Sequence, residues 1–582
     1  MTSNQKIASR LQNNLRFTSD NINMADCYWL CANKDQIQAL RSQSHQMIWG
    51  RRGTGKTTLL KAFNYEINHI ESNPSVVSLY IMLAGLIPDK REINIEESNS
   101  VGITLYVFCT LIAEICEQLG KIYEHRSNAL EPYQSESFIG AYDELIRYLT
   151  TAETVILGAK ISMEQTNKQE STKETSREAV LSAGLTNSVF KSVFSFLKKH
   201  NGVKSQTNLF QVQGTLGFNL ETKKIESLLT RMLDLLGISF AYICLDEFSE
   251  VDKLFDYSIQ SSLAQMIKQV FFKNEKYSVK IASIWNESKL QSRGGNRLVE
   301  GIEYKQDIFP GPDLDTVFLN NHEMIKPYFI GLLVNTYYGS ETPTDSEKEA
   351  IAACLENNIF GKDGLRHLIC GSQGISRDFA LLCKDYLSFY TAAKTNMPLR
   401  LGVIYDLIKN QYLEKVHTQI PKYDIYKVIN KFMETTQSRY FLISRDDYQR
   451  CNSAIKYLEA RGVYMQLPGV NTARALRDDY KLFIINYGNY LDALENRISY
   501  QKGRKTLDED SNLNSGGSLF PDQYDEIVSD PQKYVIKIPE NVENQVYCEA
   551  CRGLYYIKSE GRTFICPKCE KMRYKFSDYR EK

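Results

Sequence analysis

The sequence lacks any apolar run of about 18 residues, the length that a transmembrane helix needs. Its first residues are polar and contain no apolar core of a secretory signal, so secretion is not expected. It also lacks an excess of charge, because 70 Lys and Arg residues balance 70 Asp and Glu residues. A protein that coats itself with nucleic acid is usually basic, so nucleic-acid binding would have to come from local patches. We therefore expect a cytoplasmic protein without a membrane span.

The chain is also poor in the features of a disulfide scaffold, with 13 cysteines among 582 residues. Nine of them are scattered, and those in apolar surroundings, such as Cys109, Cys116 and Cys244, are typical of small core residues. A hydrophobic content of 43% and a charged content of 24% indicate an ordinary globular protein rather than a fibrous or disordered one. A chain of this length is too long to fold around a single hydrophobic core, so two to four domains are expected.

One glycine-rich stretch has the pattern G-x-x-x-x-G-K-[ST]. A short apolar run (46–49) precedes it and an apolar-periodic run (59–63) follows it, which predicts a strand, a loop and a helix. Glycines let successive N–H groups turn inward around an anion, and the helix adds the positive end of its dipole. The predicted nucleotide-binding residues are Gly50, Arg51, Arg52, Gly53, Thr54, Gly55, Lys56, Thr57 and Thr58.

Two side chains of this loop have predicted chemical roles. Lys56 is expected to reach the β- and γ-phosphates of ATP, and the Thr57 hydroxyl to complete the shell of Mg²⁺. The alternative, a glycine-rich turn before a helix, has no use for Lys and Thr at these offsets. No Asn-Lys-x-Asp motif, typical of guanine recognition, follows the core strands, so we expect adenine.

A second apolar run, 240–245, ends in Asp246 and Glu247. After a complete phosphate loop, this pattern predicts that Asp246 holds Mg²⁺ through water and that Glu247 orients and polarises the attacking water. A further strand, predicted over 279–286, ends in Asn286. This amide can bridge the γ-phosphate and the attacking water, although an asparagine that caps a turn gives the same pattern.

Three arginines are candidates for contact with phosphate. Arg293 and Arg297 lie in a Gly-rich stretch, and one of them could act as an arginine finger on a neighbouring subunit's nucleotide, or both could be solvated surface residues. Arg377 follows the predicted N-cap Ser376 of a helix. A positive charge there opposes the helix dipole by about 0.3–1 kcal/mol, which a phosphate contact would explain.

Near the end of the chain, Cys548 and Cys551 form one C-x-x-C pair, and Cys566 and Cys569 form another. Two such pairs at this spacing predict a tetrahedral Zn²⁺ site. So small a module has too little core to fold without metal. Disulfides are a weaker interpretation in a chain without an export signal.

Together these motifs resemble the AAA+ ATPases, in particular the branch of origin-recognition and replication initiators and their bacterial relatives. The resemblance covers roughly residues 25–500, where the stretches around Lys56, Asp246, Asn286 and Arg377 match the branch's Walker A, Walker B, sensor 1 and sensor 2 in order. It implies an α/β fold and ATP hydrolysis coupled to assembly. Bacterial chains of this kind are often accessory ATPases of mobile elements or anti-phage systems.

The expected domains follow from the resemblance and from the pattern of the chain. They are a P-loop core at 1–320 with a helical insertion at about 124–220, a helical lid at 321–420, a winged helix at 421–500, a linker at 501–530 and a zinc ribbon at 531–582. The insertion is longer than an initiator needs, and one of its segments (189–200) is either a core-facing helix or an amphipathic surface helix.

The expected partners stay open at this point. The winged helix is predicted as two helices, 423–435 and 446–461, followed by a hairpin. Aspartates lie among its basic residues, so docking to DNA or to protein fits equally. The basic residues that could meet phosphates are Arg445, Arg450, Lys456, Arg461, Arg474 and Arg477. The end of the chain is basic, with Lys571, Arg573, Lys575 and Arg580 beside Tyr574 and Phe576, which suits nucleic acid or protein. No effector motif is evident, so a homo-oligomer with a partner effector is expected. Rival interpretations are a STAND-like signalling scaffold with little turnover and a DNA-loading factor.

Overall fold

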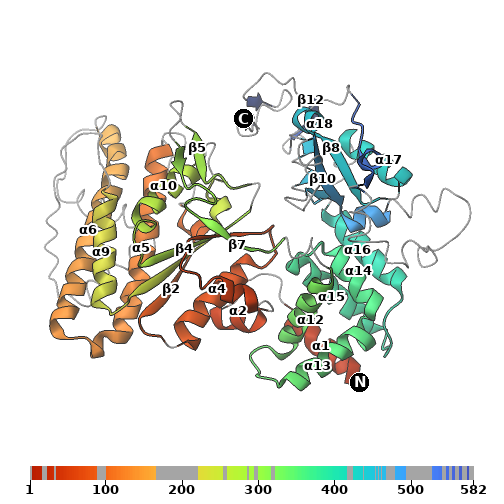
Figure 1. The fold of residues 1–582 in the computed structure, drawn as a ribbon, viewed down its shortest axis with the longest axis horizontal. Helices are drawn as coiled ribbons and strands as arrows, with labels where there is room; N and C mark the ends of the chain where they lie inside the picture. The colour runs from red at the N-terminus through yellow and green to blue at the C-terminus, as the bar shows by residue number, and fades with distance from the viewer. Residues whose placement is uncertain are drawn as a thin grey trace, which may run out of the picture. The chain divides into compact units, whose positions relative to one another are not determined.

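The computed structural model divides the chain into two compact units (Figure 1). The sheet unit is Ser19–Leu314, and the helical unit combines Met1–Thr18 with Asp315–Lys582. The structure describes residues 3–15, 23–31, 34–71, 73–87, 100–165, 221–252, 259–284, 287–293, 299–315, 322–415, 424–436, 438–451, 454–455, 458–459, 462–466, 479–492, 527, 529–539, 545–548, 553–556, 563–565 and 573–575.

The centre of the sheet unit is a five-stranded sheet in the order β2-β3-β4-β1-β7, in which every pair of neighbours is parallel. Its strands are β1 (Gln46–Trp49), β2 (Val76–Met82), β3 (Phe240–Asp246), β4 (Tyr277–Ser283) and β7 (Phe309–Asp313). All residues of β1, β3 and β4 are buried, because a parallel sheet is covered on both faces. The predicted α/β fold class is confirmed in this core.

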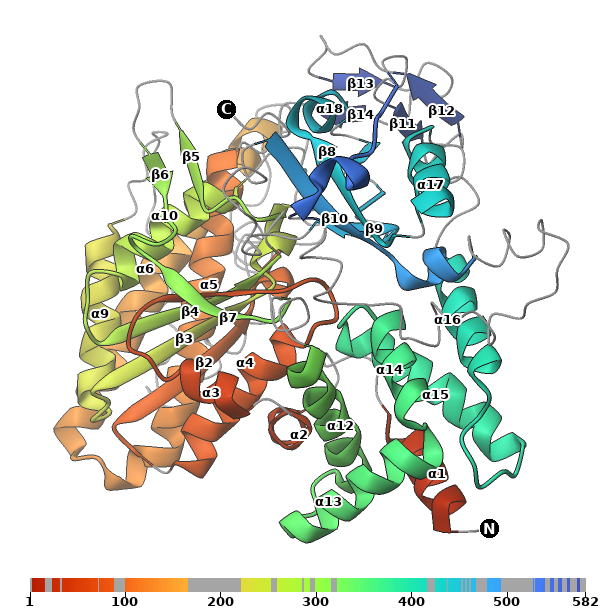
Figure 2. The same cartoon turned by 45° about the vertical axis from the view of Figure 1, so that its right-hand side comes forward.

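Helices cover both faces of the sheet (Figure 2). On one face, α4 (Lys56–Tyr65) packs with α2 (Met24–Leu30) and α3 (Lys34–Ala39). The other face carries α5 (Ser100–Arg126), α9 (Thr222–Leu235) and α10 (Gln260–Phe271), and α6 (Pro132–Gln165) packs against α5 and α9. A small hairpin of β5 (Gln291–Arg293) and β6 (Val299–Gly301) adjoins α10.

One described helix, Ile103–Ala129, is long and apolar enough to cross a membrane by length and composition, with a mean hydropathy of 1.4 in its most apolar window. From the sequence, no segment long and apolar enough to cross a membrane was expected. Of that window, 78% is buried inside the protein, where α5 packs against β2, α6 and α10. A core helix of this kind meets the same criteria as a membrane span.

The helical unit is built on one hydrophobic core. Its larger helices are α1 (Ser3–Asn14), α12 (His322–Tyr338), α13 (Asp345–Cys354), α14 (Lys362–Gly371), α15 (Ser376–Ala392) and α16 (Leu401–Lys415). The sequence placed residues 1–320 in the P-loop core, but α1 packs against α12 and α15 instead. An amphipathic pattern shows that a helix has a buried face and does not show which core covers that face.

The same unit contains a three-stranded antiparallel sheet in the order β8-β10-β9. Its elements are α17 (Asp424–Thr436), β8 (Tyr440–Ser444), α18 (Arg445–Arg450), β9 (Tyr464–Gln466) and β10 (Tyr480–Ile485). Strand β8 was not predicted from the sequence, because a short apolar run fits a helix or a strand equally well. It also predicted one helix over 446–461, whereas α18 ends at Arg450 and residues 454–455 and 458–459 are helical again.

Two hairpins end the described chain. One joins β11 (Gln545–Cys548) to β12 (Gly553–Tyr556), and the other joins β13 (Thr563–Ile565) to β14 (Arg573–Lys575). The predicted linker at 501–530 lies almost wholly outside the described residues, as does the part of the predicted insertion at 166–220.

Candidate functional site

The loop between β1 and α4 needs its glycines. Gly53 and Gly55 have φ angles of 82° and 98°, in the left-handed region that glycine adopts without strain. A Cβ atom on Gly50 would lie 2.5 Å from the Thr54 hydroxyl oxygen. Gly55 is the N-cap of α4 and supplies no side-chain hydrogen bond, so the first N–H groups of the helix are left to another acceptor. A loop of this shape before a helix fits an anion.

Lys56 lies folded across this loop. Its ammonium donates hydrogen bonds to the backbone oxygens of Gly50, at 2.6 Å, and Arg51, at 2.9 Å. The Thr54 hydroxyl also donates to the Arg51 oxygen, at 2.8 Å. The lysine is therefore held at the mouth of the loop, one residue before the Thr57 hydroxyl.

Arg52 turns away from the loop towards carboxylates. Its guanidinium lies 2.7 Å from Glu250 Oε1 and 3.3 Å from Glu287 Oε2, and its side chain is 50% exposed. Burial raises the pKa of Glu250, Arg52 opposes that rise, and Glu287 adds to it. Arg52 thus links the loop to the segments that follow β3 and β4. Its side chain is directed at these carboxylates and not at the phosphate position that the sequence predicted for it.

Asp246 is the last residue of β3 and is fully buried. Tyr242 and Cys244 lie in the core on the α4 face of the sheet. Because side chains alternate along a strand, Asp246 shares that face. The carboxylate of Asp246 and the hydroxyl of Thr57, in the first turn of α4, are thus at the carboxyl end of the sheet on its α4 side. Carboxylate and hydroxyl oxygens are the hard ligands that suit Mg²⁺.

The carboxylate of Asp246 is fixed by two donors. The Tyr80 hydroxyl donates to Oδ2 at 2.9 Å, and the backbone N–H of Glu247 donates to Oδ1 at 2.9 Å. The sequence analysis missed Tyr80, because nothing in the pattern of β2 distinguishes it from a core tyrosine. Strand register alone, with Met82 paired to Asp246, brings β2 beside this carboxylate.

Glu247 has a φ angle of 59°, which is strained for a residue with a side chain. It begins the turn into a short helix at Phe248–Asp252, where the Glu250 N–H donates to the Glu247 oxygen at 2.9 Å. Strained backbone of this kind clusters at functional sites. Both residues of the predicted acidic pair, Asp246 and Glu247, thus lie at the carboxyl end of β3.

The predicted end of β4 was wrong by three residues. The strand is Tyr277–Ser283, not 279–286, because the chain turns after Ser283 and the Glu287 N–H donates to the Ile284 oxygen at 3.1 Å. Asn286 lies outside the described residues. The polar residue that ends β4 is Ser283, which is buried and hydrogen-bonded to the hydroxyl of Ser288.

Two of the three candidate arginines belong to described elements. Arg293 is the last residue of β5, and its side chain is not described; Arg297 lies outside the described residues. Arg377 is in the first turn of α15, in the helical unit. The N-cap of this helix is Ile375 rather than the predicted Ser376, a difference of one residue at a helix end. Arg377 Nε lies 3.9 Å from Asp378 Oδ1, and its side chain is 43% exposed.

Of the four predicted zinc ligands, the structure describes only the backbone of Cys548, at the end of β11. Cys551, Cys566 and Cys569 lie outside the described residues. Their places in the chain are informative, because Cys551 falls between the paired strands β11 and β12, and Cys566 and Cys569 fall between β13 and β14. The first C-x-x-C pair thus begins at the last residue of β11 and ends in the connection that follows, and the second lies within the connection between β13 and β14.

One arginine predicted to meet nucleic acid is used within the protein. Arg450 donates to Asp447, one turn earlier in α18, and to the backbone oxygens of Ile538 and Pro539, both at 3.0 Å. Its guanidinium therefore joins α18 to the chain after the small sheet. Of the other basic residues named for this region, Lys456, Arg461, Arg474 and Arg477 lie outside the described residues.

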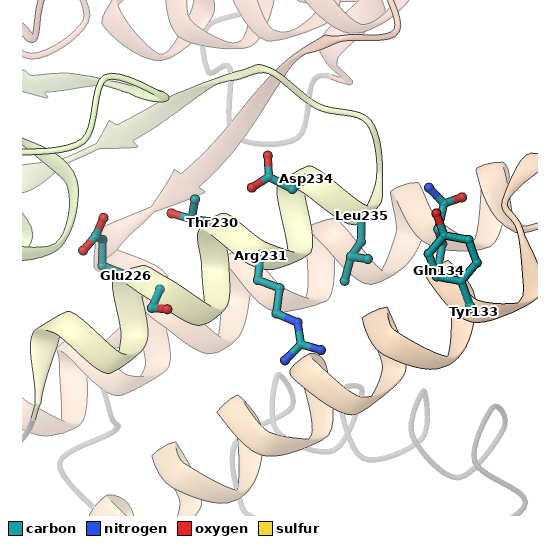
Figure 3. Close-up of a pocket in the computed structure, with 8 residues that line it drawn as sticks. Tyr133, Gln134, Glu226, Thr230, Arg231, Asp234 and Leu235 are labelled. Atoms are coloured by element: carbon teal, nitrogen blue, oxygen red, sulfur yellow. The ribbon is translucent and has the colours of Figure 1, made fainter.

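Two open grooves lie on the far side of the sheet unit from α4. The larger, of about 590 Å³, runs between α6 and α9 and includes Tyr133 and Arg231 (Figure 3). Its acids are already engaged, since Asn274 donates to Glu226 at 2.7 Å and Lys276 forms an ion pair with Asp234. The smaller groove is crossed by ion pairs such as Lys224 with Glu144, at 3.1 Å. Neither groove includes a residue of the phosphate loop.

No model of a known protein family and no curated protein matches this sequence.

Proposed function

We propose that the protein binds ATP with Mg²⁺ and hydrolyses it to ADP and phosphate. The observation that carries the proposal is the loop at 50–55, in which Gly53 and Gly55 have positive φ angles immediately before α4. This loop follows β1, which runs parallel to β4 and β3, so it lies at the same end of the sheet as Asp246, the last residue of β3. Lys56 is within reach of any phosphate in that loop, because its ammonium already contacts the backbone oxygens of Gly50 and Arg51 in the loop.

The proposed roles follow from the chemistry of each group. N–H groups of the loop and the start of α4 bind the phosphates, and Lys56 exchanges its two carbonyl partners for phosphate oxygens. Thr57 and Asp246 would hold Mg²⁺, which supplies charge neutralisation between the phosphates. Glu247 orients a water for attack on the γ-phosphorus and polarises it. Adenine rather than guanine remains the proposed base, from the sequence alone.

We extend the proposal to a switch of the AAA+ type, with the helices at 322–415 as its lid. The antiparallel sheet β8-β10-β9 with α17 and α18 supports a winged-helix module, because helix, strand, helix and two further strands follow one another there. The use of Arg450 inside the protein favours docking to a protein over docking to DNA in that module. A homo-oligomer with an effector partner, in a mobile element or in anti-phage defence, is the proposed setting.

The decisive experiment measures nucleotide affinity and steady-state ATPase rate in the same set of variants. Lys56→Ala should weaken ATP binding by about tenfold or more, because a charge-assisted contact is lost. Arg52→Ala is its matched control in the same loop and should bind ATP within about twofold of the parent, since Arg52 faces carboxylates.

Hydrolysis is tested in the same way. Glu247→Gln should bind ATP and lose most turnover, because only the water-orienting carboxylate is removed. Glu250→Gln, one turn further along the chain and paired with Arg52, should keep most turnover. Unchanged affinity in Lys56→Ala would reject the phosphate site, and equal ATPase rates in Glu247→Gln and the parent would reject the role of Glu247.

A further inference from the structure

Tyr80 is a buried polar residue that neither the motif pattern nor the proposed roles above use. It lies on β2 and its side chain is 8% exposed, in the core between the sheet and α4. Its hydroxyl points at the end of the neighbouring strand, where it lies 2.9 Å from Asp246 Oδ2. The contact joins two strands through a fully buried carboxylate.

The direction of this hydrogen bond follows from the chemistry of its two groups. An ionised carboxylate has no proton to donate, whereas the Tyr80 hydroxyl carries one, so the phenol donates and Asp246 accepts. A donor to a charged acceptor forms a stronger bond than a neutral pair does.

The carboxylate of Asp246 is consequently held at both oxygens. Tyr80 occupies one lone pair of Oδ2, and the Glu247 N–H occupies one lone pair of Oδ1. Each carboxylate oxygen has a second acceptor direction, which neither of these two hydrogen bonds uses. Rotation of the carboxylate would break one or both of these bonds inside a buried site, which is costly.

The geometry points to Tyr80 as a positioning residue for magnesium, acting through Asp246. This inference rests on the proposed function, and it adds a residue on β2 that orients the carboxylate before the metal arrives. Partners that orient the groups around a metal commonly change its affinity by about 10–100-fold when they are removed. Tyr80 should therefore affect the magnesium dependence of nucleotide binding, and it should not affect binding to the phosphate loop in the absence of metal.

The test is Tyr80→Phe, which removes only the hydroxyl. ATP affinity is measured without metal and then at increasing Mg²⁺ concentration. We expect metal-free affinity within about twofold of the parent, and a magnesium concentration for half-maximal gain that is about tenfold higher. Tyr80→Met fills the same apolar space without a donor and should show the same shift, so the test does not depend on one variant folding.

The chain offers a closely matched control. Tyr242 lies on β3 in the same core, is 6% exposed, and donates its hydroxyl proton to the Arg41 backbone oxygen at 2.7 Å. Tyr242→Phe makes the same chemical change on the same face of the sheet, away from Asp246. It should leave the magnesium midpoint unchanged.

Three outcomes would overturn the inference. An unchanged or lower magnesium midpoint in both Tyr80 variants shows that the hydroxyl does not position the metal site. An equal rise in Tyr242→Phe shows that the effect comes from general loosening of the core. A parent protein that binds ATP with no gain from magnesium would also remove this inference, whereas a parent that binds no ATP would remove the proposed function itself.

Discussion

His367, at the scale of single residues, is an imidazole ring enclosed by two tyrosines. It lies on α14 with 2% of its surface exposed, and its Nδ1 and Nε2 atoms lie 2.8 Å from the Tyr487 hydroxyl and 3.3 Å from the Tyr405 hydroxyl. Burial, together with the charge of the nearby Arg366, lowers the pKa of His367 to about 4. A neutral ring can donate to one tyrosine and accept from the other.

The first prediction concerns acid stability. The unfolded chain binds a proton at His367 near pH 6.5 and the folded protein only near pH 4, so folding stability falls as pH decreases between these values. The full difference corresponds to about 3 kcal/mol. Thermal unfolding of the parent should therefore shift downwards between pH 6.5 and pH 4, and His367→Gln should show a smaller shift.

The control for this prediction is His125→Gln, which changes an exposed histidine on α5. It should keep the full acid shift of the parent. His45, in the sheet unit, also has a pKa lowered by burial to about 4, so some acid sensitivity should persist in His367→Gln. An identical pH dependence in His367→Gln and the parent would contradict the assignment.

At the scale of secondary-structure elements, the two terminal hairpins are too short to hold themselves together. Each pair has strands of three or four residues, and isolated two-stranded hairpins are marginally stable in water. One C-x-x-C pair lies at the end of β11 and in the connection after it, and the other lies in the connection between β13 and β14. A metal bound by both pairs would supply the missing stability.

The second prediction follows from these hairpins. Purified protein should contain about one zinc ion per chain by elemental analysis, because four thiolates complete a tetrahedral site. The double change Cys548→Ser and Cys566→Ser should remove the metal. Cys109→Ser and Cys116→Ser, which alter two buried core cysteines, form the control and should retain it. A parent protein without zinc would refute the site.

Elements differ in how far the sequence could predict them. The strand at 46–49 and the acidic end of β3 were predicted because buried parallel strands are apolar runs that end abruptly in polar residues. The end of β4 was misplaced, because Ser283 resembles a core residue and Asn286 resembles a strand end. Tyr80 was missed because its role comes from strand register, which one sequence does not reveal.

At the scale of the whole molecule, the proposed switch places its phosphate loop and Arg377 in different units of the chain. Arg377 is in the first turn of α15, where a positive charge opposes the helix dipole. Asp378 beside it, at 3.9 Å, compensates in part. The resemblance to the AAA+ ATPases implies that Arg377 contacts a nucleotide phosphate, and such a contact would offset the remaining electrostatic cost only when nucleotide is bound.

The third prediction is that Arg377→Ala leaves the nucleotide-free protein as stable as the parent or slightly more stable. The stabilisation conferred by Mg-ATP should shrink, because it follows the affinity for the ligand. Thermal melts with and without Mg-ATP measure both quantities. Arg445→Ala is the control, since Arg445 begins α18 in the same unit, and it should keep the full ATP increment. A lower melting temperature without nucleotide and an undiminished increment would make Arg377 a structural residue.

The placement of α1 has a consequence for the order in which the chain can fold during synthesis. Ala8, Leu11 and Leu15 are buried in a core whose other members begin at Ile325. Helix α1 therefore has no partner until the whole sheet unit has been made, whereas Ser19–Leu314 contains its own cores and can fold as soon as it emerges. This helix would thus remain exposed to chaperones and proteases throughout translation of the sheet unit, and would pack only when α12 and α15 appear.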